Sequence, residues 1–191
     1  MNALEGKKIL VTAGGTQEFI DDVRVMTNIS SGKLGATIAS VLMTADADVY
    51  YVCGRTAIKP LMHADYLPAD SKLLHVQKVR TALDAMKAME YIITREKIDA
   101  VVHAMAVSDF TFKRGKAVKL KSNDTERFIE YMRQTITKNP KIIAHIKQWC
   151  PETILIGFKF EVGASLQELM SQANKSLLRN KCDLVIANDK E

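Results

Sequence analysis

Two segments near the N-terminus of this 191-residue chain carry residue types that suit phosphate binding. The first is a glycine turn, 13–16, set directly behind the apolar run 9–11, and the second is 27–35, which reads TNISSGKLG. Glycines let backbone N–H groups approach phosphate oxygens, while hydroxyls, an amide and a lysine add hydrogen-bond donors and a positive charge. The two segments therefore predict a site for a phosphorylated ligand. Their candidate residues are Gly14, Gly15, Thr16, Asn28, Ser30, Ser31, Gly32 and Lys33.

Short apolar, β-branched runs alternate with longer amphipathic stretches, and this alternation predicts the elements that position those residues. The expected strands are 8–12, 48–52, 100–105, 153–158 and 183–187, and the expected helices are 33–44, 81–95, 140–149 and 166–180. Continuous apolar runs are typical of parallel strands that are buried on both faces. The chain is therefore predicted to be an α/β protein with a doubly wound, mostly parallel Rossmann-like sheet, forming a single domain over residues 1–191.

Local signals predict two helix starts and one unusual segment. Asn139 before Pro140 predicts an N-cap followed by proline at the first helical position, and Ser165 predicts the N-cap of the last long helix. The segment 111–137 is polar and charged with little periodicity. In a compact domain such a segment predicts an irregular binding loop or an arm that reaches a partner subunit.

The chemistry-bearing segments are expected at one edge of the sheet. In an open parallel sheet, ligands bind beyond the carboxyl ends of the strands. Five segments are expected to follow strands there: 14–16, 53–55, 106–110, 157–161 and 187–189. We expect one crevice to collect them.

A dinucleotide site is the first alternative, because a glycine turn after the first strand is its usual entry point. The adjacent Gly14 and Gly15 do not make a G-x-G-x-x-G motif, and no acidic residue ends the second predicted strand. A Tyr-x-x-x-Lys dyad is absent as well. Arg55 would still meet a 2′-phosphate, so an NADP-type Rossmann oxidoreductase stays open as an alternative.

Covalent catalysis and the Walker type of phosphate loop have little support. Ser30 and Ser31 lie in no G-x-S-x-G motif, and the Walker motif fails because Leu34 follows the pair Gly32-Lys33.

Composition narrows the partners and the compartment. The net charge is +5, but the lysines are spread out and aromatic residues make up only 6%, which argues against a nucleic-acid partner. The three cysteines and four histidines show no metal-ligand spacing, so no metal ligands are assigned. Neither an apolar run long enough for a membrane span nor a signal peptide is present. We therefore expect a cytoplasmic protein with no membrane partner.

Eight short motifs, taken in order and spacing, carry a resemblance to a known family. They are VTAGGT (11–16), IDDVR (20–24), NISSGKLG (28–35), AVSDF (106–110), KLK (119–121), KNP (138–140), GF (157–158) and AND (187–189). The set resembles the phosphopantothenate–cysteine ligase (phosphopantothenoylcysteine synthetase) family of coenzyme A biosynthesis, the synthetase half of the DNA/pantothenate metabolism flavoproteins. It covers nearly the whole chain, and its third motif is the most specific.

The resemblance implies a two-step amide synthesis. The carboxylate of 4′-phosphopantothenate attacks the α-phosphate of CTP or ATP, pyrophosphate leaves, and the amine of cysteine then displaces the nucleoside monophosphate. Mg²⁺ and a lysine would neutralise the developing charge. By motif position Lys119 is the nucleotide-activating lysine and Lys121 its helper, while the Asn28 amide would hold the carbonyl of the acyl nucleotide.

The resemblance also implies binding roles and a partner. Gly14, Gly15, Ser30, Ser31 and Gly32 would lie near the phosphates, with Thr16 and Lys33 beside them, and Ala106, Asp109 and Phe158 around the ribose and base. A homodimer is implied, with the arm around Lys119 helping to close the partner's site. No flavin-binding half precedes Met1, so we expect a ligase without flavin.

Departures from the family pattern bear on the nucleotide and leave a third function open. Gln17 replaces the family's usual arginine, and 157–161 resembles the ATP-using eukaryotic relatives more than the CTP-using bacterial ones. The choice between CTP and ATP therefore stays open. A nucleotide-binding paralogue without catalytic activity is the other alternative.

Overall fold

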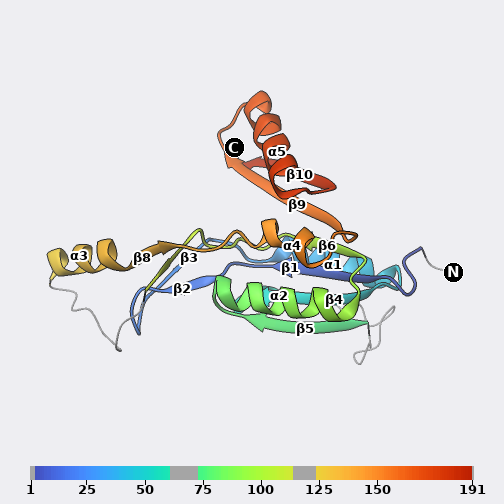
Figure 1. Cartoon of the computed structure of the whole chain (residues 1–191), viewed down its shortest axis with the longest axis horizontal. Helices are drawn as coiled ribbons and strands as arrows, with labels where there is room; N and C mark the ends of the chain where they lie inside the picture. The colour runs from blue at the N-terminus through green and yellow to red at the C-terminus, as the bar shows by residue number, and fades with distance from the viewer. Residues whose placement is uncertain (1–2, 61–72, 114–123, 191) are drawn as a thin grey trace.

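An open, six-stranded parallel sheet forms the centre of the computed structural model, which describes residues 3–60, 73–113 and 124–190 (Figure 1). Its strands are β1 (Lys8–Ala13), β4 (Asp48–Gly54), β5 (Leu74–Val79), β6 (Ala100–His103), β9 (Ile154–Val162) and β10 (Leu184–Lys190). Their order is β10-β9-β6-β1-β4-β5, and every neighbouring pair is parallel. This is the doubly wound order, in which the chain changes direction across the sheet between β1 and β6. The predicted fold class is confirmed.

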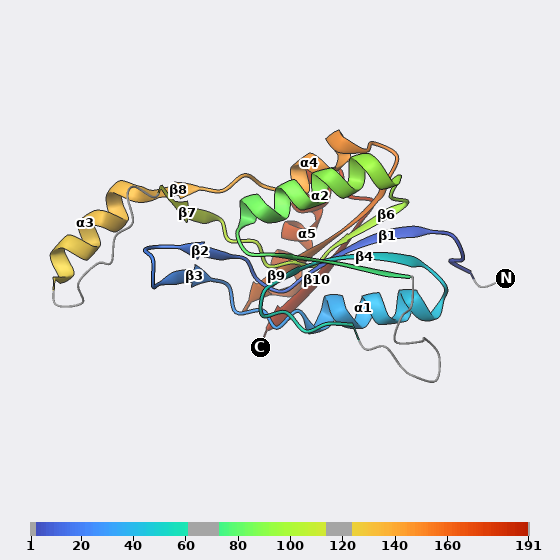
Figure 2. The same cartoon turned by 90° about the horizontal axis from the view of Figure 1, so that it is seen from below.

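Helices cover both faces of the sheet (Figure 2). On one face α1 (Lys33–Thr44) packs Ala36, Ala39 and Met43 against buried residues of β1 and β4. On the other face lie α2 (Ala82–Glu96), α4 (Ile143–Trp149) and α5 (Leu166–Asn180). Successive residues of β1 alternate between the two layers, so that Val11 packs under α1 while Leu10 packs under α2 and α4. The two apolar cores fix which side chains each strand end presents.

Of the four predicted helices, two have the predicted bounds, α2 is shifted by one residue from the predicted 81–95, and one begins three residues late. The bounds of α1 and α5 are as expected, and Ser165 caps α5 in a capping box with Glu168. The prediction that Asn139 caps a helix starting at Pro140 is wrong, because α4 begins at Ile143. The Asn139 amide instead donates to the carbonyl of Ser108 at 3.0 Å, which ties this residue to the loop after β6.

The expectation of an irregular segment at 111–137 is wrong for its described part. Strand β7 (Phe110–Phe112) pairs antiparallel with β8 (Ile136–Lys138), and α3 (Thr125–Thr135) lies between them in the chain. A second ribbon pairs β2 (Gln17–Phe19) with β3 (Val25–Thr27). These elements extend together from one end of the sheet and are called the arm below (Figures 1 and 2).

A buried carboxylate joins the arm to the sheet. Glu18 of β2 is only 2% exposed, and its Oε1 accepts from the Ala82 N–H at the start of α2 at 2.7 Å. Its Oε2 accepts from the Thr111 hydroxyl of β7 at 2.8 Å. Within the arm, the Tyr131 hydroxyl of α3 donates to the carbonyl of Ile20 at 2.9 Å. One side chain therefore positions both ribbons relative to α2.

Two segments that were expected to follow strands lie inside them, and the first two residues of a third, Cys53 and Gly54, belong to β4. Residues 157–161 belong to β9, and 187–189 belong to β10, because the two strands pair in register from Ile156 and Leu184 onward to Val162 and Lys190. This part of the prediction is wrong. Both strands thus extend past the end of β6, and they form one wall beside the loop that follows it. Within the described ranges, none of the helices combines the length and apolarity needed to cross a bilayer.

Candidate functional site

The predicted glycines pack three loops onto one another at the carboxyl ends of β1 and β4. Gly14 and Gly32 have left-handed backbones, with φ of 76° and 74°. A Cβ on Gly54 would lie 2.3 Å from the carbonyl oxygen of Gly15, and a Cβ on Gly15 would lie 2.7 Å from that of Asn28. Only glycine fits such contacts. We call the segments 14–16, 28–32 and 54–58 the loop cluster.

The start of α1 is the part of the loop cluster that suits an anion. Gly32 is the N-cap, and among the described residues no side chain caps it with a hydrogen bond. The first turn holds no acidic residue, and the backbone N–H of Lys33 donates to the Ser31 hydroxyl oxygen at 3.3 Å. The N–H groups of a first helical turn lack partners within the helix and carry partial positive charge. Ser30, Ser31, Gly32 and Lys33 therefore surround a place that favours phosphate.

Thr16 and Ala106 join the loops that follow β1 and β6. The Ala106 N–H donates to the Gly14 carbonyl at 2.8 Å, and the Thr16 N–H donates to the Ala106 carbonyl at 3.3 Å. The Thr16 side chain is fully buried, and its hydroxyl accepts from the Ser108 N–H at 2.9 Å. These polar groups hold the protein together, so the structure gives both residues a positioning role for the loops.

Asn28 connects the loop cluster to the loop after β6. Its side chain is exposed, and the amide Nδ2 donates to the Val107 carbonyl at 3.2 Å. The residue therefore stands between the start of α1 and the cleft that opens on the other side of that loop.

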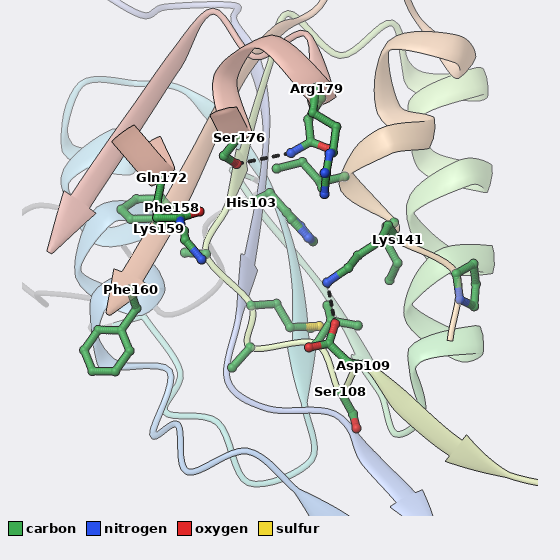
Figure 3. A pocket seen from close by; sticks show the side chains of 18 of the residues that line it. His103, Ser108, Asp109, Lys141, Phe158, Lys159, Phe160, Gln172, Ser176 and Arg179 are labelled. Atoms are coloured by element: carbon green, nitrogen blue, oxygen red, sulfur yellow. Dashed lines mark hydrogen bonds and ion pairs between the residues drawn. The ribbon is translucent and has the colours of Figure 1, made fainter. Parts of the chain in front are cut away.

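A cleft of about 450 Å³ opens at the carboxyl end of β6, beside residues 158–160 of β9 and beneath α5 (Figure 3). Three of the predicted site residues line it: Ala106, Asp109 and Phe158. Phe158 also packs against the core under α1, which fixes its position. The structure thus divides the predicted site into two groups, the loop cluster and this cleft, which meet at the loop after β6.

Long basic side chains line the cleft, and of these only Lys159 belongs to a segment that was expected at the site, 157–161. Lys141, Lys159, Lys175 and Arg179 are in the lining, and Asp109 is its one acidic member among the described residues. The Lys141 ammonium pairs with the Asp109 carboxylate (Figure 3), and Lys159 pairs with Glu161 at 2.8 Å. An excess of positive charge in a concave site attracts anions. In sequence Lys141, Lys175 and Arg179 look like ordinary surface residues, since no short motif contains them.

A buried histidine forms part of the cleft floor. His103 ends β6 and is 8% exposed, and its Nδ1 lies 3.0 Å from the Thr12 hydroxyl oxygen. Loss of hydration on burial lowers the pKa of His103 to about 4, so its ring is neutral at pH 7.

Two predicted site residues lie outside the described residues, namely Lys119, the nucleotide-activating lysine, and Lys121, its helper. Their roles stay predictions. Within the described ranges, no group of three or more His, Cys, Asp or Glu side chains is arranged to hold a metal ion.

Comparison with protein families places the chain. The family described as the DNA/pantothenate metabolism flavoprotein C-terminal domain matches residues 4–191. The chain belongs to this family. The resemblance inferred from the eight motifs is therefore confirmed at the level of the family, and the match covers both the loop cluster and the cleft.

Individual relatives of this C-terminal domain family are longer than the chain. The coenzyme A biosynthesis bifunctional protein CoaBC of Thermococcus kodakarensis is 37% identical over 186 residues, which cover 97% of this chain and 42% of the relative. The CoaBC of Bacillus subtilis is 32% identical over 187 residues, covering 97% and 41%. The chain spans about two fifths of the length of these relatives.

Solved structures of the family share the architecture. The DNA/pantothenate metabolism flavoprotein from Streptococcus pneumoniae has a TM-score of 0.77 at 35% identity, over 96% of this chain and 82% of that one. The C-terminal domain of a CoaBC protein has a TM-score of 0.74 at 29% identity, over 98% and 80%. A Cab2 variant in complex with phosphopantothenate-cysteine shares the fold, with a TM-score of 0.73 at 18% identity.

Proposed function

We propose that this chain is a phosphopantothenate–cysteine ligase, which joins 4′-phosphopantothenate and L-cysteine through an acyl-nucleotide intermediate formed from CTP or ATP. The observation that carries the proposal is the family match over residues 4–191, together with curated relatives named as coenzyme A biosynthesis proteins. The two-part site supports it, since the reaction needs one place for phosphates and one for a nucleoside.

The nucleotide would lie across the boundary between the loop cluster and the cleft. Its phosphates would meet the start of α1 at Ser30–Gly32, where N–H groups and the helix dipole favour negative charge. Its nucleoside would enter the cleft beside Asp109 and Phe158. Occupation of the cleft by a ribose would compete with Lys141 for the Asp109 carboxylate.

Asn28 would hold the reacting carbonyl at the boundary between the loop cluster and the cleft. Its amide is exposed and already donates to a loop carbonyl, so its orientation is fixed before substrate binds. An amide donates a hydrogen bond to a developing oxyanion and, unlike a carboxylate or an amine, does not compete as a nucleophile. Lys119, with Lys121, would neutralise charge at the α-phosphate as pyrophosphate leaves.

We assign Mg²⁺ to the nucleotide substrate. Triphosphates in water bind Mg²⁺ through their β- and γ-oxygens, and the ion keeps several of its waters. The residues given to phosphate binding here are hydroxyl, amide and backbone N–H donors, which suit the remaining phosphate oxygens. The expectation that no flavin takes part stays a prediction.

A homodimer is part of the proposal, with the arm as its interface. Helix α3 packs none of its side chains into a core within the part of the chain that the structure describes. Ile129, Ile136 and Phe110 of the arm are 48%, 43% and 42% exposed. Apolar side chains gathered on a projecting element are typical of a surface that pairs with another chain.

The test is a coupled assay of both reaction steps. Protein incubated with 4′-phosphopantothenate, cysteine, Mg²⁺ and either CTP or ATP is expected to release pyrophosphate and form the amide, measured by mass spectrometry. Omission of cysteine is the control, because it should leave acyl nucleotide without amide. No pyrophosphate with either nucleotide would contradict the ligase, and tight NADPH binding in a fluorescence titration would favour the oxidoreductase instead.

A further inference from the structure

His103 occupies the position in the sheet where ligand crevices form. It is the last residue of β6, and its register partner is Thr12 of β1, so it stands between the two strands at which the chain changes direction. Ligands of open α/β sheets bind at the carboxyl end of this strand pair. The histidine is therefore on the site side of the sheet.

The hydrogen bonds around Thr12 decide which nitrogen of His103 carries the proton. The Met105 N–H donates to the Thr12 hydroxyl oxygen at 3.1 Å, which occupies one acceptor position of that oxygen. The single hydroxyl hydrogen of the fully buried Thr12 then has one acceptor among the described residues, the Nδ1 of His103 at 3.0 Å. Buried hydroxyls are almost always satisfied, so Thr12 donates and Nδ1 accepts. The neutral ring thus carries its proton on Nε2.

The Nε2–H group faces the cleft. His103 lines the cleft, and Figure 3 shows its ring in the middle, between Arg179 of α5 and Lys141. Nε2 has no hydrogen-bond partner among the residues that the structure describes, and it is not one of their buried unpartnered polar atoms. It is therefore open to a ligand in the cleft.

The surroundings keep the ring neutral. The charged side chains of the cleft are the cations Lys141, Lys159, Lys175 and Arg179, together with Asp109, which is paired with Lys141. An excess of positive charge opposes a further positive charge on the imidazole, and burial opposes it as well. With Nδ1 occupied by Thr12, the ring can donate one hydrogen bond to the cleft but cannot act there as a base.

The chemistry of the cleft selects the group that would accept this hydrogen bond. Near His103 the lining contains the apolar side chains of Met105 and Ile143: the Met105 N–H bonds the same Thr12 hydroxyl as His103, and Ile143 lies against Gly157, the register partner of His103. Lys141, Lys175 and Arg179 are longer and more exposed. A flat, weakly polar ring with acceptor atoms at its edge fits beside apolar groups, and phosphates fit beside cations. The deep part of the cleft therefore suits the base of a nucleotide.

We propose that His103 is a nucleotide-binding residue, whose Nε2–H donates a hydrogen bond to an acceptor atom on the base of the nucleotide. This inference rests on the proposed ligase function and goes further by naming a residue that reads the base. In this proposal Thr12 stabilises the Nε2–H tautomer of His103, which directs the donor into the cleft.

Two amide variants separate this role from a structural one. The amide nitrogen of glutamine reaches the position of Nε2, whereas the amide of asparagine reaches only that of Nδ1. We expect His103→Asn to raise the nucleotide KM about tenfold and His103→Gln to stay within about threefold of the unaltered chain, because a lost hydrogen bond to a buried acceptor has a cost of this size. In both variants kcat and the KM for cysteine should change less than about twofold. Unfolding midpoints of both variants are measured alongside.

The outcomes distinguish this inference from the function on which it rests. An unaltered chain that makes no amide overturns the proposed function. If the unaltered chain is active, equal nucleotide KM values for the two variants overturn the role of His103. A rise in the KM for 4′-phosphopantothenate instead overturns the assignment to the base. Steady-state kinetics with CTP and with ATP give all of these values.

Discussion

The loop cluster and the cleft lie at the same edge of the sheet and are built in opposite ways. In the loop cluster, backbone meets backbone: a Cβ on Gly54 or Gly15 would collide with a carbonyl oxygen at 2.3 or 2.7 Å. In the cleft, long side chains such as Lys175 and Arg179 reach in from α5, which has no buried residues in the described part of the chain. One part is rigid before any ligand binds, and the other can adapt.

The difference fits the two tasks of the proposed reaction. Stabilising a developing charge needs donors that are already in place, because moving them during the reaction costs free energy. Binding a charged ligand tolerates mobile cations, since their attraction falls slowly with distance. Changes to the loop cluster should therefore affect chemistry and folding, and changes at the cleft rim should affect affinity alone.

The largest effect is expected at Asn28. Asn28→Asp should still release pyrophosphate without cysteine but should lower amide formation by about 100- to 1000-fold, the usual cost of losing one oxyanion donor. Lys119→Gln is the matched contrast and should impair pyrophosphate release itself. The two steps are followed separately by pyrophosphate detection and mass spectrometry. Normal amide formation by Asn28→Asp would remove that residue from its role.

The next effect concerns the packing of the glycines. Gly54→Ala should lower the free energy of unfolding by about 3 kcal/mol or more, because its Cβ meets backbone that cannot move aside. Gly163→Ala is the control: nothing lies within 4 Å of its Cβ, and its φ of 66° should cost about 1–2 kcal/mol. Urea unfolding measures both. Equal losses of unfolding free energy in the two variants would show that the backbone of the loop cluster can move aside, which would contradict the tight packing.

His103 in the cleft floor should make the free energy of unfolding depend on pH. The pKa of His103 is lowered to about 4 in the folded state, from an ordinary value of 6.5. The unfolded chain binds the proton first as pH falls, so stability present above about pH 6.5 is lost progressively down to about pH 4, by up to about 3 kcal/mol. His103→Gln should lack this loss. Parallel stability curves for the two chains between pH 7 and 4 would contradict the neutral, buried ring.

The smallest effect on stability is expected at the cleft rim. Lys141→Ala breaks the ion pair between Lys141 and Asp109, and the two side chains are 70% and 60% exposed. The substitution should therefore change the free energy of unfolding by less than about 1 kcal/mol. The same variant should change the nucleotide KM by a few fold, because it removes one cation and frees the Asp109 carboxylate. Urea unfolding and steady-state kinetics on one preparation give both numbers. If Lys141→Ala failed to fold, the cleft rim would matter for stability as much as the loop cluster does, which would contradict the difference drawn between them.

Sequence patterns predicted the long elements because each carries its own signal. The amphipathic periods of α1 and α5, and the Ser165 cap, are local features, so they survive folding unchanged. The three-residue strands of the arm are too short to show a period, and Asn139 looks like a cap until its amide finds the Ser108 carbonyl. Tertiary partners decide such positions.

The sequence predicted only the part of the site whose residues are adjacent in the chain. Its glycine and serine motifs are contiguous in sequence, but the packing of Gly14, Gly15 and Gly54 against other loops appears only when the strands lie side by side. The cleft cations come from a helix, a loop and strand β9 with no shared motif, and His103 is one histidine at the end of a strand. The role proposed for His103 depends on its hydrogen bond with Thr12, which is 91 residues away in the chain.

The carboxylate of Glu18 couples the position of the arm to that of the sheet edge that carries the candidate site. It holds the start of α2 and the first strand of the β7–β8 ribbon at once, and that ribbon continues the loop that lines the cleft. If a second subunit docks on the arm and binds one position of the arm more tightly than another, it also favours one position of the loop after β6. Linkage then requires the reverse as well, so a nucleotide in the cleft would change the dimer dissociation constant by the same factor.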